Sequence, residues 1–120
     1  MQHLITCYVR YFINPNNVEE FERYARIWIS LIEKYGGTHH GYYLPAETPA
    51  SAAFSFPGIG EEGPANVAVA LFSFPNLAQY DIYRERAAED PDCRIATAIQ
   101  QETPCFLKYE RSFMRRCETG

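Results

Sequence analysis

The sequence predicts an α+β fold with a split βαβ arrangement, and three observations predict it. Strand and helix patterns follow one another as strand, helix, strand, strand, helix, strand. The helix after the first strand is strongly amphipathic. The first and third strands are apolar on both sides, as in a sheet covered on both faces. With 120 residues, 47% hydrophobic and 22% charged, residues 1–120 suit one domain whose core needs no disulfide or metal.

The first strand and helix carry the clearest patterns. Residues 4–13 are mostly β-branched or aromatic and end at Asn14-Pro15, which is typical of a strand closed by a turn. Asn17 and Glu20 resemble a capping box. Gly36-Gly37 is expected to stop the helix. The apolar positions between these signals alternate steps of three and four: Val18, Phe21, Ala25, Trp28, Ile32 and Tyr35.

Residues 38–44 are predicted as a second strand, and the connection from Pro45 to Ala65 is several times longer than a hairpin loop. We expect it to be either a disordered excursion or a lid. Three apolar residues within it favour a segment that packs onto something: Phe54, Phe56 and Ile59.

The second half of the chain supplies two strands and a broken helix. Residues 66–74 are predicted as the third strand and residues 105–116 as the fourth. A helix begins at Pro75-Asn76, is broken by Asp90-Pro91, continues through Ile99, and ends before Pro104. Its predicted inner stripe consists of Leu77, Tyr80, Tyr83, Arg84 and Ala87.

This order of elements is ferredoxin-like, a four-stranded antiparallel sheet with the first and third strands central and helices on one face. Helices on one face leave the other uncovered, and a long terminal edge strand without a partner invites aggregation. We therefore predict a homodimer in which the two sheets face each other.

Charge and composition exclude several classes of function. The net charge is −4 and the pI near 5.3. The basic residues are scattered apart from Arg111, Arg115 and Arg116, so we expect no nucleic-acid partner. The apolar runs are far shorter than the ~20 residues of a membrane span, and the start of the sequence lacks a secretory pattern. We expect a cytoplasmic protein. The four cysteines, which include no Cys-x-x-Cys pair, are Cys7, Cys93, Cys105 and Cys117.

Candidate ligand contacts come from the alternation of the strands. The two facing sheets of the predicted homodimer would form a barrel. If the even positions line this barrel, they include Tyr8, Arg10 and Phe12 on the first strand. The third strand would add Ala68, Ala70 and Phe72, and the fourth Phe106, Lys108 and Glu110. Aromatic walls, small alanines and one arginine suit a planar or acidic ligand. The alternative for Arg10 is a structural ion pair with Glu110.

Histidine and tyrosine supply the other candidates. His39 and His40 are consecutive on a strand and point to opposite faces, so they cannot share a metal; we expect no metal site. Either could act as a general base or haem ligand at the barrel rim, or be purely structural. Tyr42 lies on the same strand. No nucleophile motif or nucleotide-binding loop is present, and we expect no cofactor.

Several short segments are characteristic when taken together: Tyr8-Val9-Arg10-Tyr11-Phe12, Gly37, Gly41-Tyr42-Tyr43, Asn66, and Tyr83-Arg84 followed by Asp90-Pro91. With these segments the chain resembles the NIPSNAP domain family of the dimeric α+β barrel superfamily. The resemblance covers nearly the whole chain and implies a ferredoxin-like protomer and a dimeric α/β barrel closed by two subunits. Relatives in the superfamily include cofactor-free monooxygenases, haem-binding enzymes and lactone isomerases.

These observations favour a homodimeric protein that binds a small aromatic or acidic ligand near Arg10. One alternative is a cofactor-independent monooxygenase or isomerase that acts on an aromatic substrate. Another is an interaction module whose outer helices bind a second protein. Whether the protein is an enzyme stays open at this stage.

Overall fold

The computed structural model describes residues 4–50 and 53–119, so residues 51 and 52 of the predicted loop lie outside the described residues. The elements follow the predicted order, with bounds within two residues of those expected. In chain order they are β1 (Ile5–Ile13), a 3-10 turn η1 (Pro15–Asn17), α1 (Val18–Lys34), β2 (Thr38–Tyr43), β3 (Val67–Phe74), α2 (Leu77–Glu89), α3 (Pro91–Glu102) and β4 (Phe106–Met114).

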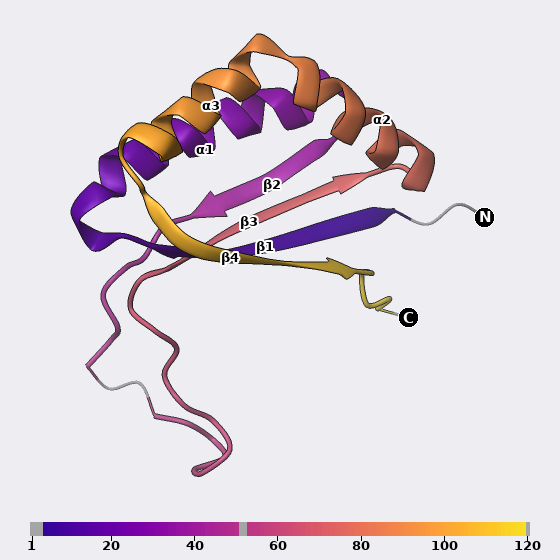
Figure 1. Ribbon diagram of the computed structural model, residues 1–120. Helices are drawn as coiled ribbons and strands as arrows, with labels where there is room; N and C mark the ends of the chain where they lie inside the picture. The colour runs from indigo at the N-terminus through magenta and orange to yellow at the C-terminus, as the bar shows by residue number, and fades with distance from the viewer. Residues whose placement is uncertain (1–3, 51–52, 120) are drawn as a thin grey trace.

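The strands form an antiparallel sheet in the order β2-β3-β1-β4, so the first and third strands are central, as predicted. In the described residues, α1, α2 and α3 lie on one side of this sheet, and the opposite side, here named the open face, carries no helix (Figure 1). The predicted ferredoxin-like α+β fold of the protomer is therefore confirmed. None of the helices in the described residues is both long enough and apolar enough to cross a bilayer.

The pairing register decides which side chains meet the helices. Cys7 lies opposite Phe72 and Tyr11 opposite Ala68, and directly opposed residues point to the same face. The helix face therefore takes the odd positions of β1 but the even positions of β3. The expectation that Ala68, Ala70 and Phe72 share a face with Arg10 is wrong, because parity in the sequence does not carry over from one strand to the next.

Phe106 is also on the helix face rather than the open face. The register between β1 and β4 shifts after Phe12, and this shift places Phe106 opposite Ile13. Its ring packs edge-on against Tyr11 and Tyr24, with centroids 5.3 and 5.2 Å apart. The local bulge, which alternation alone does not indicate, turns this residue into the core.

The N-terminus of helix α1 differs from the sequence prediction, whereas its C-terminus agrees with it. Asn17 is its N-cap residue, but the side chain makes no cap hydrogen bond; its Nδ2 donates to the Pro104 carbonyl at 2.8 Å. The capping box is therefore absent, because Asn17 ties the helix start to the segment before β4. At the other end Gly36 has φ +93°, as the predicted glycine stop requires.

The inner stripe of α2 is shorter than expected. Tyr80, Tyr83 and Ala87 are buried, but Leu77 is 59% exposed and Arg84 is exposed too. Leu77 is the first residue of α2, so the sheet and α1 do not cover it completely.

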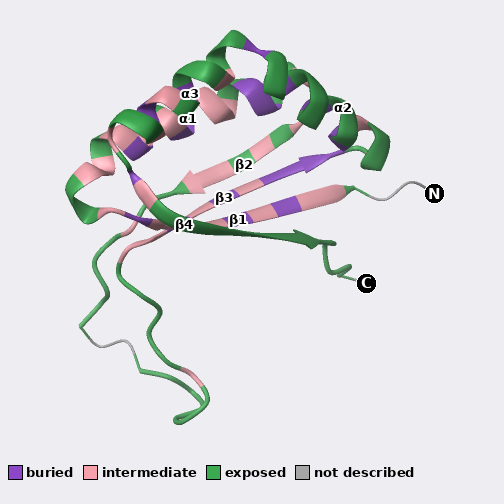
Figure 2. Ribbon diagram, viewed as in Figure 1, coloured by how far each residue is buried: buried purple, intermediate pink, exposed green. Residues whose placement is uncertain are grey.

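The connection between β2 and β3, residues 44–66, is here named the long loop. It projects from the sheet on the side away from the helices (Figure 1), and its described residues are almost all exposed (Figure 2). Phe56 is 71% exposed and Ile59 is 83% exposed. The three apolar residues for which packing is expected, Phe54, Phe56 and Ile59, are therefore all exposed in the described part of this chain.

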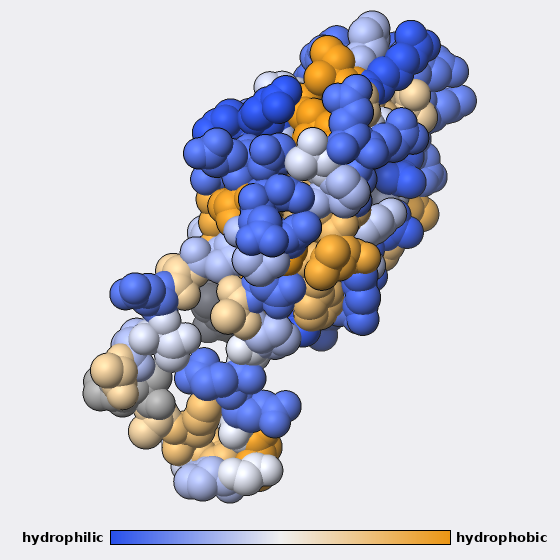
Figure 3. Space-filling model, turned by 60° about the vertical axis from the view of Figure 1, so that its left-hand side comes forward, coloured by the Kyte–Doolittle hydropathy of each residue, from blue (hydrophilic) through white to orange (hydrophobic). Residues whose placement is uncertain are grey.

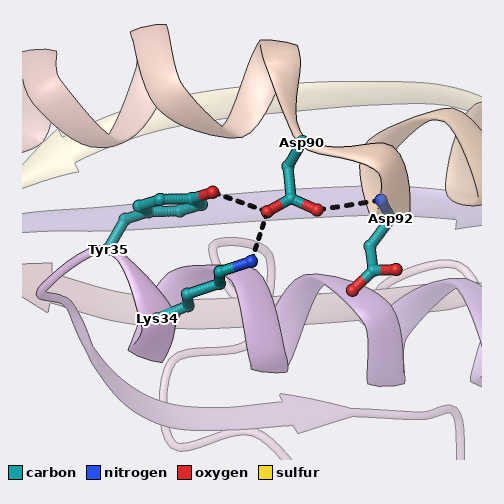
Figure 4. Close-up of polar contacts among 4 residues, drawn as sticks. All are labelled: Lys34, Tyr35, Asp90 and Asp92. Carbon is teal, nitrogen blue, oxygen red and sulfur yellow. Dashed lines mark hydrogen bonds and ion pairs between the residues drawn. The ribbon is translucent and has the colours of Figure 1, made fainter.

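A buried carboxylate, Asp90, joins the C-terminal end of α1 to the start of α3 (Figure 4). Asp90 accepts hydrogen bonds from Lys34 Nζ at 2.7 Å and from the Tyr35 hydroxyl at 2.5 Å. Its second oxygen accepts from the Asp92 backbone N–H at 2.9 Å, which caps α3. The hydrogen bond from Lys34, followed by that from Tyr35, lowers the pKa of Asp90 to about 2. One side chain thus fixes α1 against the junction of α2 and α3.

This arrangement predicts a pH-dependent contribution to stability. The pKa of Asp90 is about 2 in the folded chain, whereas an unfolded aspartate titrates near ~3.9. The stabilisation is therefore complete above pH ~4 and disappears as the pH falls towards ~2. Asp90→Asn should unfold at a lower urea concentration than the wild type at pH 7, and the difference should shrink below pH ~4. A difference that persists unchanged at pH ~2 would contradict this assignment.

Candidate functional site

The residues predicted to contact a ligand divide between the two faces of the sheet. Five of them lie on the open face of β1 and β4: Tyr8, Arg10, Phe12, Lys108 and Glu110. Arg10 pairs with Glu110 and Phe12 with Lys108, whereas Tyr8 pairs with Ser112. His40 joins them from β2, because its Nε2 lies 2.8 Å from the hydroxyl of Ser73, which shares the open face with Thr6. The other three are on the helix face: His39, Tyr42 and Phe72.

The open-face group is held together by weak ionic contacts around one ring. Arg10 Nε lies 3.9 Å from a Glu110 oxygen, and Lys108 Nζ lies 3.7 Å from the other. Both cations approach the Phe12 ring, at 4.8 and 5.0 Å from its centre. The Arg10 and Glu110 side chains are 36% and 51% exposed, so this pair contributes about 0–1 kcal/mol. The expected pair is present, and the buried Arg10 Nε still has no hydrogen-bond acceptor.

The two histidines face opposite sides, as expected. The His39 ring stacks on Tyr42 with centroids 5.4 Å apart, while His40 contacts Ser73. Burial lowers the pKa of His39, so its imidazole is neutral at pH 7. Within the described residues, no three His, Cys, Asp or Glu side chains are grouped as metal ligands would be.

A cavity of about 130 Å³ lies between the sheet and the helices, and its walls are mainly aromatic. We name it the aromatic cavity. It forms where side chains of α1 and α2 meet the helix face of the sheet. Its lining residues are Val9, Tyr11, Tyr24, Trp28, Ile32, Tyr42, Phe72, Tyr80, Tyr83, Arg84, Tyr109 and Arg111.

The hydroxyl groups in this cavity stay protonated at neutral pH. Burial raises the pKa of Tyr24, Tyr42 and Tyr83 well above the usual value, and Tyr11 behaves in the same way. The Tyr11 and Tyr42 hydroxyl oxygens lie 3.5 Å apart. None of the lining residues is Asp, Glu or His. The lining therefore offers neutral O–H groups that can donate hydrogen bonds, and no side chain suited to act as a base.

Positive charge enters the cavity from two sides. Arg84 comes from α2, and Arg111 comes from β4, where its Nη1 donates to the Tyr80 hydroxyl at 3.3 Å. No carboxylate in the described residues lies within ion-pairing distance of either guanidinium. The buried Trp28 Nε1 has no hydrogen-bond acceptor in the described structure. The cavity thus combines unused donors with aromatic surface.

Sequence reasoning named two lining residues, Tyr42 and Phe72, but placed Phe72 on the other face, and it missed the arginines. The sequence pattern places Arg84 in an inner helical stripe and Arg111 in a small basic group with Arg115 and Arg116, and neither pattern indicates a cavity. The signal that could have found the cavity is the aromatic pair Tyr24 and Trp28, four residues apart on α1.

Comparisons with known proteins support the fold and give the family. A structure of an uncharacterised NIPSNAP-like domain protein from Burkholderia xenovorans is 17% identical, covers 100% of this chain and 90% of its own, and has a TM-score of 0.70. A NIPSNAP family protein of unknown function from Agrobacterium tumefaciens is 16% identical, with coverages of 99% and 93% and a TM-score of 0.71.

A more distant similarity is to a putative antibiotic biosynthesis monooxygenase from Nitrosomonas europaea. It is 8% identical, with coverages of 97% and 92% and a TM-score of 0.60, and it shows the fold alone. No match is found among the curated proteins. The family model described as NIPSNAP matches residues 8–118. The chain therefore belongs to the NIPSNAP family.

Proposed function

We propose that this protein binds a small aromatic acid in the aromatic cavity. The observation that carries the proposal is the combination of aromatic walls with two arginines that have no carboxylate partner. Arginine recognises a carboxylate through two parallel hydrogen bonds and also stacks on rings. The volume of about 130 Å³ is close to that of a cavity of about 150 Å³ which accommodates benzene. A single-ring acid is therefore the ligand class that fits.

The polar groups suit binding better than proton transfer. The tyrosine hydroxyls stay neutral, because burial raises their pKa, and they donate to an acceptor oxygen on the ligand. Trp28 Nε1 supplies a further donor. A monooxygenase or isomerase that removes a proton needs a base, and the lining provides none. Binding is the function that these side chains support.

Trp28 gives a direct assay, because it is the only tryptophan in the chain and it lines the cavity. Benzoate and 2-hydroxybenzoate should change its fluorescence with a saturable dependence on concentration. Arg84→Ala and Arg111→Ala should each raise the Kd about tenfold, since a charge-assisted hydrogen bond is lost. The same variants should bind neutral phenol as the wild type does.

The matched control is Arg94→Ala, which removes an exposed arginine on α3 that does not line the cavity. It should leave the Kd for benzoate unchanged. If no aromatic acid alters Trp28 fluorescence, or if Arg94→Ala weakens binding as much as Arg84→Ala, the proposal is wrong.

The protonation state of the tyrosine hydroxyls can be tested in a separate experiment. The chain has nine tyrosines, and burial raises the pKa of Tyr11, Tyr24, Tyr42 and Tyr83 well above 10. During an alkaline titration followed at 295 nm, these four should ionise only when the protein unfolds. Ionisation of all nine near pH 10 in the folded protein would show that the cavity is open to water.

We also propose that the protein forms a homodimer through the open face of the sheet. Val67, Val69 and Leu71 lie on this face and are half-buried with no helix above them. A second copy would cover these residues and would enclose the open-face group around Arg10. The predicted ligand contacts on this face, Arg10 and Glu110 among them, would then line a chamber shared by the two copies.

The homodimer predicts a strong effect of charge on the open face. Leu71→Arg should convert a dimer into a monomer in sedimentation or light scattering, because a buried unpaired charge opposes association. Ile82→Arg is the control, since Ile82 is an exposed isoleucine on α2. A wild type that is monomeric at 100 µM, or a dimer that Leu71→Arg leaves intact, would contradict this pairing.

A further inference from the structure

The end of the long loop is a formed turn that exposes two apolar side chains. The Ile59 and Gly60 backbone N–H groups both donate to the Phe56 carbonyl at 3.0 Å. Gly58 has φ +87°, and a Cβ at Gly60 would lie 2.6 Å from the Phe54 ring. We name residues 54–60 the loop tip. The hydrogen bonds and close packing of this turn therefore hold the Phe56 and Ile59 side chains in exposed positions.

The loop tip lies apart from the rest of this chain. Figure 3 shows hydrophobic residues gathered at the end of the projecting loop, beyond the body of the molecule. The loop leaves the sheet between Tyr43 and Val67, and it extends on the side opposite the helices (Figure 1). An apolar tip in this position has no surface of its own chain to cover.

An apolar groove of matching character lies at the other end of the sheet. It has a volume of about 480 Å³ and is lined by Leu4, Ile5, Leu77, Phe113, Met114 and Arg115. Ile5 begins β1 and Met114 ends β4, whereas the long loop adjoins the opposite ends of β2 and β3. Ile5 and Phe113 are on the helix face, because they pair with Phe74 and Cys7, whereas Met114 pairs with Thr6 and belongs to the open face. The groove therefore lies mainly on the helix side, at the end of β1 and β4, and it meets the surface that we propose as the dimer contact at Met114.

Charge is complementary between the loop and the groove. Residues 44–66 contain Glu47, Glu61 and Glu62 and no lysine or arginine. Glu61 and Glu62 directly follow the loop tip. Arg115 lines the groove and Arg116 follows it. An apolar contact with opposite charges at its border is typical of a specific interface.

Symmetry explains how one molecule's loop can reach another's groove. When two sheets face each other across a two-fold axis perpendicular to the strands, the loop end of one copy lies at the groove end of its partner. Each copy then donates one loop tip and accepts one. A two-fold axis parallel to the strands would bring the two loop ends together and would leave both grooves empty.

We propose that the loop tip of one copy docks into the apolar groove of a second copy, with Phe56 and Ile59 as the inserted side chains. This inference rests on the proposed homodimer and adds to it the residues that lock the two copies together. It also gives the long loop a role as an intermolecular contact, in place of a lid over its own sheet.

The test compares Ile59→Glu in the loop tip with Leu77→Glu in the groove by analytical ultracentrifugation. Each should raise the dimer Kd at least tenfold, because each removes both symmetric contacts. Both residues are exposed, and a glutamate in the first turn of α2 is favourable for the helix. Circular dichroism should therefore show both variants folded. Ile95→Glu is the matched control, since Ile95 is an exposed isoleucine on α3 outside the groove, and it should leave the Kd unchanged.

Mixing the two variants distinguishes contact between copies from contact within one. A heterodimer of the Ile59→Glu and Leu77→Glu chains keeps one intact tip and groove, so it should form at lower concentration than either variant alone. If the wild type is monomeric, the docking and the homodimer both fail. If Leu71→Arg breaks the dimer but Ile59→Glu does not, only the docking fails. If the mixed variants dimerise no more tightly than either variant alone, the loop tip does not dock into a partner's groove.

Discussion

The pairing register of β1 with β3 is the constraint on which the rest of this structure depends. It places Cys7 opposite Phe72 and Tyr11 opposite Ala68, so one face of the two central strands becomes the floor of the core. A shift by one residue would turn one of the two strands over relative to the other. If β1 kept its face, Val67, Val69 and Leu71 would then meet the helices in place of Ala68, Ala70 and Phe72.

The aromatic cavity follows from this register. Val9, Tyr11 and Phe72 line the cavity from β1 and β3, and the register turns all three to the helix face. Aromatic rings from α1 and α2 line the same space from the other side. Arg111 reaches the same space because it lies opposite Val9. A ligand site of this kind is built by contacts between strands, and no single segment of the chain carries it.

The two faces of the sheet thus suit different tasks. The helix face carries a cavity with aromatic walls and two arginines that have no carboxylate partner among the described residues, which suits a small anionic ring. The open face is broad and partly apolar, and it carries the weak Arg10–Glu110 contact. Such a surface suits a second copy of the chain better than a small molecule bound to one protomer. The long loop and the apolar groove extend that surface at its two ends.

The sequence by itself determined the elements and their order. The three- and four-residue spacing on α1, the break at Asp90-Pro91 and the apolar central strands reflect local backbone preferences and periodicity. These signals act within short segments, and the four-stranded topology followed from them. The tertiary structure alone decided which face each strand turns to the helices. Strand register is set across the sheet and not along the sequence. Contacts between segments far apart in the chain therefore decided the shift after Phe12, the burial of Phe72, the hydrogen bond from Asn17 to Pro104 and the presence of Arg84 and Arg111 in one cavity lining.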